Sequence, residues 1–175
     1  MKNILVVAND SKLASIIENS FECRDALASL EADSEIKVTH FKSHTQVMEH
    51  LSAHFGQVNL GRINDTIVFV DLMLEEMDGL SVVETIRNQY HQLSIAAFVC
   101  KQSVSGPLED LQLKSQAEAS GANLVLLAPF NLREIGSCVD RLFAAGEETV
   151  SADSVSADLG TAAALQAETA QAATH

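Results

Sequence analysis

Five short apolar runs, separated by longer segments of helical periodicity, constrain this chain more than any other feature of its sequence. The runs cover residues 4–7, 36–41, 67–70, 95–99 and 124–127. Four of them are nearly continuous in apolar residues rather than alternating, as is typical of parallel strands that are covered on both faces. The pattern therefore favours a parallel sheet buried between two layers of helices.

Apolar residues also recur at helical spacing in the segments that follow the runs. The segment 107–119 is weaker, because Leu108 and Leu111 are followed by mostly polar residues, although Pro107 suits a first helical turn. Strand and helix then alternate five times, which predicts right-handed crossovers and an α/β fold. The other four helical faces consist of these residues: Leu13, Ile16, Ile17, Phe21 and Leu27; Val47, Met48, Leu51 and Phe55; Leu80, Val83 and Ile86; Leu132, Ile135, Val139, Leu142 and Phe143.

The composition changes abruptly near residue 146. Residues 146–175 contain no Lys or Arg, five acidic residues and nine alanines, so this stretch cannot add a core. We expect one domain over residues 1–145 and an acidic, Ala-rich tail over residues 146–175 that is flexible or partly helical, with residues 159–173 the most helix-prone part. A linker end, a partner-binding segment and plain disorder all remain open for the tail.

Charge and the cysteines exclude several classes of function. The formal net charge of -13 repels nucleic acid and anionic membranes, so neither is an expected partner. The first apolar run is too short for a signal peptide or a membrane span, and we expect a cytoplasmic protein. Three cysteines without a CxxC spacing predict reduced, packed thiols rather than disulfides or zinc ligands: Cys23, Cys100 and Cys138.

Asp71 is the leading candidate for a functional residue. It ends the third apolar run, and open α/β folds place their chemistry at the carboxyl ends of such strands. Asp78, seven residues later, precedes Gly79 and is expected to cap the third helix through its side-chain oxygen. The sequence therefore predicts a site around Asp71, at the end of the third strand.

Three features together resemble the receiver domain of two-component response regulators. They are the first apolar run leading to Asn9-Asp10, Asp71 followed by Met77-Asp78-Gly79, and Pro129-Phe130 after the fifth run. The resemblance covers about residues 2–144. It implies a flavodoxin-like, doubly wound sheet of five parallel strands in the order 2-1-3-4-5 with five helices, (βα)5.

The resemblance also implies a chemistry for Asp71, which in this family accepts a phosphoryl group from a histidine kinase. An acidic pair after the first strand, the acceptor aspartate and a backbone carbonyl two residues on, here that of Met73, bind Mg²⁺. A hydroxyl residue at the end of the fourth strand and a lysine before Pro129 bind the phosphoryl oxygens. An aromatic residue in the fifth strand reports the phosphorylated state.

This chain departs from the family at most of those supporting positions. Loss of ligand charge should weaken any Mg²⁺ site strongly, so Asn9, Asp10, Asp71 and the Met73 carbonyl would form a weak site at most. Lys101 could place an ammonium near Asp71 and neutralise it, or it could be a solvated loop lysine. The departures are Ala8 and Asn9 in place of the acidic pair, Val99 in place of the hydroxyl, Val125 in place of the aromatic residue and Ala128 in place of the lysine.

Other kinds of site have little support. His50 and His54 are spaced as metal ligands on one helix would be, but nothing supplies a third ligand, and exposed polar-face histidines explain them equally. The chain has neither a Gly-rich phosphate loop after the first strand nor a G-x-S-x-G elbow. The sequence predicts no enzyme.

Two functions remain. The first is a degenerate receiver, or pseudo-receiver, that signals through protein contacts made by its fourth helix, fifth strand and fifth helix, with phosphorylation of Asp71 weak or absent. The alternative is a phosphoaccepting response regulator in a histidine-kinase phosphorelay, with Asp71 as the acceptor. Either function requires a protein partner, such as a histidine kinase or a downstream effector.

Overall fold

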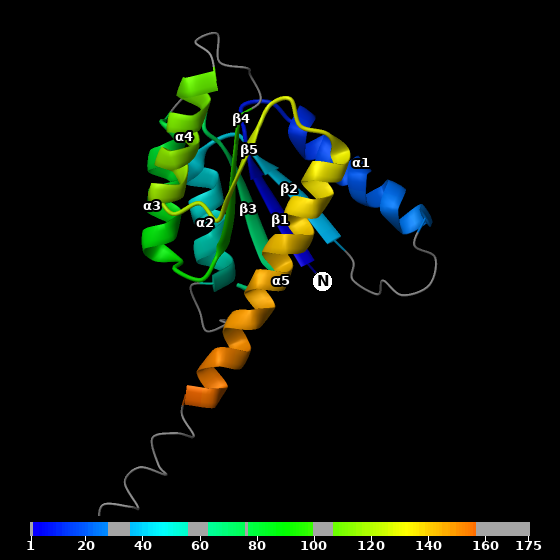
Figure 1. Ribbon diagram of the computed structural model, residues 1–175, viewed down its shortest axis with the longest axis vertical. Helices are drawn as coiled ribbons and strands as arrows, with labels where there is room; N and C mark the ends of the chain where they lie inside the picture. The colour runs from blue at the N-terminus through cyan, green and yellow to red at the C-terminus, as the bar shows by residue number, and fades with distance from the viewer. Residues whose placement is uncertain (1, 28–35, 56–62, 76, 100–106, 157–175) are drawn as a thin grey trace, which may run out of the picture.

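The computed structural model describes residues 2–27, 36–55, 63–75, 77–99 and 107–156 (Figure 1). Strands and helices alternate along these residues, as the sequence predicts. The elements are β1 (Lys2–Val7), α1 (Lys12–Leu27), β2 (Ile36–Phe41), α2 (His44–Phe55), β3 (Thr66–Asp71), α3 (Gly79–Gln89), β4 (Ser94–Val99), α4 (Pro107–Ala119), β5 (Leu124–Leu127) and α5 (Leu132–Ser156).

The five strands form one parallel sheet in the order β2-β1-β3-β4-β5, which confirms the predicted topology. Every residue of β3 and β4 is buried, which is why these strands read as continuous apolar runs. The register pairs Val7 with Val70 and Asp71 with Phe98. The carboxyl ends of β1, β3 and β4 therefore meet at one edge of the sheet.

Helices cover both faces of the sheet (Figure 1). The helices α1 and α5 lie on one face, where Leu13, Ile17 and Ile135 join a core cluster with Phe69 and Phe98. The helices α2, α3 and α4 lie on the other face, over a second cluster that contains these buried helix residues: Val47, Leu51, Val82, Val83, Ile86 and Ala117.

The start of α3 is fitted closely to the end of β3. Asp78 is the N-cap, as predicted, and its Oδ1 accepts a hydrogen bond from the backbone N–H of Leu80 at 3.3 Å. Gly79 is buried against β3, and a Cβ at this position would lie 2.4 Å from both the Asp71 carbonyl oxygen and the Leu72 Cα. The glycine that follows Asp71 is therefore needed for close packing of helix on strand.

An arginine on α3 holds the turn that leads into β5. The Arg87 guanidinium donates two hydrogen bonds to the Gly121 carbonyl, at 2.9 and 2.8 Å, and one to Asn123 Oδ1 at 2.6 Å. Gly121 has a φ of 107°, in the left-handed region that favours glycine. Burial lowers the pKa of Arg87 from its ordinary value, but an arginine remains charged at neutral pH.

The last helix extends beyond the predicted domain boundary. Asn131 and Glu134 form a capping box, in which each side chain accepts a hydrogen bond from the other residue's backbone N–H, at 3.0 and 2.8 Å. From there α5 runs to Ser156, eleven residues past position 145. Buried Gly146 lies on this helix, close to the Asn64 carbonyl. The stretch 146–156 is therefore helical, whereas residues 159–173 lie outside the described residues.

Cys138 confirms the prediction of a packed thiol. It is 2% exposed and not part of a disulfide, and burial raises its pKa to about 11. The side chains of Cys23 and Cys100 lie outside the described part of the chain. None of the helices in that part is both long enough and apolar enough to cross a bilayer.

Candidate functional site

The strand ends enclose a cavity of about 350 Å³ beside Asp71. Parallel strands bring their carboxyl ends to one edge, which explains why residues more than sixty positions apart meet here. Three regions supply the lining: the loop after β1, the first turn of α1 and the loop after β3. The lining residues are Ala8, Asn9, Asp10, Lys12, Leu13, Asp71, Met73 and Glu75.

Asp71 is held at the floor of this cavity. Its side chain is only 8% exposed, and Oδ1 accepts a hydrogen bond from the backbone N–H of Met73 at 2.9 Å. The next residue, Leu72, donates its N–H to the Phe98 carbonyl of β4 at 2.9 Å, so the sheet continues past Asp71. The strand end thus fixes both the position and the orientation of the carboxylate.

Asn9 connects the two loops that flank the cavity. Its Nδ2 donates a hydrogen bond to the Met73 carbonyl at 3.2 Å, and its Oδ1 accepts one from the backbone N–H of Glu75 at 3.3 Å. Both polar ends of the carboxamide are therefore bound to the loop after β3. Sequence reasoning placed Asn9 in the pocket but missed this bridge.

Asp10 is turned toward Lys12 at the mouth of the cavity. The Lys12 backbone N–H donates to Asp10 Oδ1 at 3.0 Å, and its ammonium lies 3.1 Å from Oδ2. These two hydrogen bonds, the backbone one foremost, lower the pKa of Asp10. The Asp10 side chain is 57% exposed and that of Lys12 is 84% exposed, so Asp10 is a solvated carboxylate paired with a lysine.

A histidine from β2 supports the loop after β1. His40 Nε2 lies 2.8 Å from the Ala8 carbonyl oxygen. A carbonyl only accepts hydrogen bonds, so Nε2 carries the proton in this contact. No sequence motif indicates this role, which depends on the pairing of β2 with β1.

Two further predicted pocket residues, Val99 and Ala128, carry no charge and are not among the residues that line this cavity. Val99 ends β4 and is 4% exposed, and its carbonyl accepts the Ala128 N–H at 3.1 Å. Ala128 is half-buried and precedes Pro129 through a cis peptide bond. Lys101, the candidate cation, lies outside the described residues.

The arrangement does not fit Mg²⁺ as the resemblance would require. Mg²⁺ needs several oxygen ligands in near-octahedral geometry, generally with more than one anionic group close by. Here the Met73 carbonyl and the Asn9 side-chain oxygen are engaged with the opposite loop, and Asp10 is paired with Lys12. Within the described ranges, no cluster of three or more His, Cys, Asp and Glu residues could hold a metal ion.

Of the two α2 histidines at metal-ligand spacing, His54 is exposed and His50 is half-buried. The rings of His50 and His54 stack with centroids 4.2 Å apart, and His54 Nδ1 lies 3.2 Å from the His50 carbonyl. Because that carbonyl accepts, Nδ1 of His54 carries a proton. Partial burial is the main cause that lowers the pKa of His50, and the nearby charges of His54 and Lys37 lower it further.

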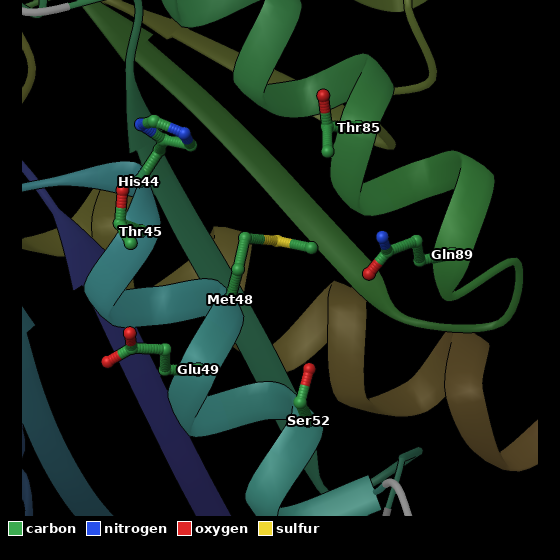
Figure 2. A pocket seen from close by; sticks show the side chains of 7 residues that line it. All are labelled: His44, Thr45, Met48, Glu49, Ser52, Thr85 and Gln89. Atoms are coloured by element: carbon green, nitrogen blue, oxygen red, sulfur yellow. The ribbon is translucent and has the colours of Figure 1, made fainter.

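A second cavity, of about 480 Å³, opens between α2 and α3 (Figure 2). The sequence contains no motif that would reveal it. The Thr85 hydroxyl on its wall donates to the Ser81 carbonyl at 2.8 Å, and the Ser52 hydroxyl lies 3.4 Å from that of Tyr90. The Ser52 and Thr85 hydroxyls are thus paired with other groups, and we describe this cavity as a groove between helices. It is lined by His44, Thr45, Met48, Glu49, Ser52, Thr85 and Gln89.

Comparison with known proteins gives matches in structure alone. No protein-family model matches the chain, and no curated protein matches it in sequence. Among solved structures, it is similar to a putative response regulator of Chloroflexus aurantiacus, with a TM-score of 0.59 and 17% identity over 82% of this chain and 98% of that one.

Two further receiver domains are similar to the same extent. The signal receiver domain of a putative Luxo repressor protein from Vibrio parahaemolyticus has a TM-score of 0.61 and 16% identity, over 85% of this chain and 94% of its own. A response regulator receiver domain protein of Clostridium thermocellum has a TM-score of 0.62 and 13% identity, over 85% and 99%. Together with the strand order and the buried Asp71, these similarities show that the chain has the fold of response-regulator receiver domains.

Proposed function

We propose that this chain is a receiver-fold signalling module that acts through protein contacts, with phosphorylation of Asp71 weak or absent. The fold supports the signalling role. Weak or absent phosphorylation is supported by the pocket around Asp71, because the described part of this pocket supplies little that could stabilise a phosphoryl group.

The composition of that pocket carries the proposal. Phosphoryl transfer to a carboxylate brings negative charges together, and they must be neutralised by cations or by converging donors. Ala8 supplies only a methyl group to the lining, and the Lys12 ammonium is held at the mouth by Asp10. Val99 and Ala128, at the end of β4 and before Pro129, are apolar as well and do not line the cavity. A missing cation near a developing phosphoryl charge costs roughly 10² to 10³ in rate.

The partner surface is proposed to be the face formed by α4, β5 and α5. Leu108 and Leu111 are 70% and 61% exposed and lie one helical turn apart on α4. The adjacent strand β5 is at the edge of the sheet and only partly buried. Exposed leucines beside an edge strand offer apolar area to a protein partner, such as a histidine kinase or a downstream effector.

Mass spectrometry of the intact full chain tests the proposal. The protein is incubated with acetyl phosphate and Mg²⁺, beside Asp71→Asn as a control that cannot accept at this position. We expect no stoichiometric gain of a phosphoryl group in the wild type. A gain of one group that disappears in Asp71→Asn would overturn the proposal in favour of a phosphorelay.

A restored variant shows that the assay can detect acceptance. It carries Ala8→Asp, Asn9→Asp, Val99→Thr and Ala128→Lys, which return the groups that the resemblance implies, and it should gain a phosphoryl group if it folds. A partner that co-purifies with the wild type should bind Asp71→Asn equally well and the double variant Leu108→Gln, Leu111→Gln at least about tenfold more weakly. Loss of the partner in Asp71→Asn, in contrast, would contradict signalling independent of phosphorylation.

A further inference from the structure

We propose that the Asn9 carboxamide takes the place of a bound Mg²⁺ as the bridge between the loops after β1 and β3, so that the pocket is held in one arrangement without metal. The inference deepens the proposed function, because it concerns how the same pocket is regulated. It rests on the contacts of Asn9 and on the polar groups of the loop that it contacts.

The bridge matches donor to acceptor at both ends. The loop after β3 presents an acceptor, the Met73 carbonyl, and a donor, the Glu75 N–H. The carboxamide meets the first with its Nδ2 at 3.2 Å and the second with its Oδ1 at 3.3 Å. A cation could satisfy only the carbonyl and would leave the Glu75 N–H facing positive charge.

The bridge also makes metal binding unfavourable in the wild type. A cation at the Met73 carbonyl would lie beside the N–H of Asn9, because both approach the same oxygen, and would weaken that hydrogen bond or displace it. Asp10, the carboxylate that the loop after β1 contributes, would have to leave Lys12. Both changes oppose binding, whereas the neutral amide adds no charge attraction to compensate for them.

The loops are supported from behind, which keeps the bridge in place. Ala8 donates its N–H to the Phe41 carbonyl at 3.1 Å, and its own carbonyl contacts His40. On the other side, Met73 is fixed by its N–H bond to Asp71. Asn9 therefore joins two loops that are each anchored to the sheet, and this geometry is independent of phosphorylation.

Replacing the Asn9 amide by a carboxylate should make the pocket favour bound Mg²⁺ over the metal-free arrangement. In Asn9→Asp the side chain loses its donor to Met73 and places negative charge beside that carbonyl, while the carboxylate approaches Asp71. We therefore expect Asn9→Asp to be less stable without metal and to recover with Mg²⁺. The control is Asn88→Asp, because Asn88 is exposed near the end of α3 and the change adds the same charge away from the pocket.

The experiment is a Mg²⁺ titration of full-length wild type, Asn9→Asp and Asn88→Asp after treatment with a chelator. Thermal unfolding and two-dimensional amide NMR serve as readouts. We expect no response in the wild type or Asn88→Asp at millimolar Mg²⁺. For Asn9→Asp we expect an affinity for Mg²⁺ at least about tenfold higher. A wild type that binds Mg²⁺ as tightly as Asn9→Asp, or an Asn9→Asp that responds no more than Asn88→Asp, would overturn the proposal.

A measurement on the wild type keeps the test decisive if Asn9→Asp does not fold. The Glu75 amide proton should be protected from hydrogen exchange in the metal-free protein, and Asn9→Ala should raise its exchange rate at least about tenfold. Equal exchange in the two proteins would refute the bridge. Phosphoryl gain in the wild type would instead refute the proposed function and leave the bridge standing, so the two failures are distinguishable.

Discussion

Gly79→Ala should destabilise the domain although alanine is the better helix former. A Cβ at position 79 would lie 2.4 Å from the Asp71 carbonyl oxygen and the same distance from the Leu72 Cα. Each distance is about 1 Å short of ordinary contact. Both neighbours are backbone atoms of a buried strand end, so a change of rotamer cannot relieve the overlap.

Two opposing contributions set how far Gly79→Ala changes the free energy of unfolding. Overpacking in a well-packed core costs about 1–3 kcal/mol, and rigid backbone places this site near the upper end. Alanine recovers at most about 1 kcal/mol of helix propensity relative to glycine, because that value holds for a helix interior and Gly79 is the first residue of α3. The net loss in the free energy of unfolding is therefore about 2 kcal/mol, which lowers the melting temperature of a chain of this size by about 4–8 °C.

Urea unfolding followed by circular dichroism measures this loss. The matched control is Asn88→Ala, on the exposed side of the same helix, which should leave stability unchanged or raise it slightly. Amide NMR should also show shifts at Asp71, Leu72 and Met73 in Gly79→Ala. If Gly79→Ala unfolds at the same urea concentration as Asn88→Ala, the close approach of α3 to β3 is not what requires glycine at this position.

Two further predictions concern the support of the sheet. Arg87→Met removes the hydrogen bonds to the Gly121 carbonyl and to Asn123, and should lower the free energy of unfolding by about 2–3 kcal/mol. The control Arg133→Met, at an exposed position, should change it by less than about 0.5 kcal/mol. Equal urea midpoints for the two variants would contradict this prediction. The pKa of Cys138 is raised from 9.0 to about 11, so its neutral thiol stabilises the fold fully below pH 9, and this contribution is lost as the pH rises through 11. Peptide mapping after iodoacetamide treatment at pH 8 should find Cys138 unmodified in the folded protein and modified in urea; rapid modification of the folded protein would refute its burial.

Much of the fold could be predicted because the relevant signals are local. Continuous apolar runs are typical of strands buried on both faces, and the runs 67–70 and 95–99 lie in the fully buried β3 and β4. The run 124–127 coincides with β5 (Leu124–Leu127), which is at the sheet edge and only partly buried. Helical periodicity located the five helices, although Leu108 and Leu111, the apolar residues that indicated α4, are exposed rather than packed on the sheet. The strand order came from the family resemblance, and the structure confirms it.

The end of the last helix was harder to predict. The change in composition near residue 146 predicted a tail that is flexible or partly helical, and it did not show that the helix α5 itself would continue to Ser156. Alanine and glutamate are good helix formers, so a helix that is already nucleated by packing extends at little cost. Loss of apolar residues marks where a core ends, not where a helix ends.

The sequence alone determined the order of the elements, the edge at which Asp71 lies and the absence of charge at positions 8, 99 and 128. Only the tertiary structure decided what the remaining polar groups do: that Asn9 bridges to Met73 and Glu75, that Asp10 turns to Lys12, and that Gly79 touches the backbone of β3. The physical reason is one of range and precision. Hydrophobic periodicity repeats within a few residues, whereas a hydrogen bond between Asn9 and a loop 64 residues away depends on placing two anchored loops to within a few tenths of an ångström.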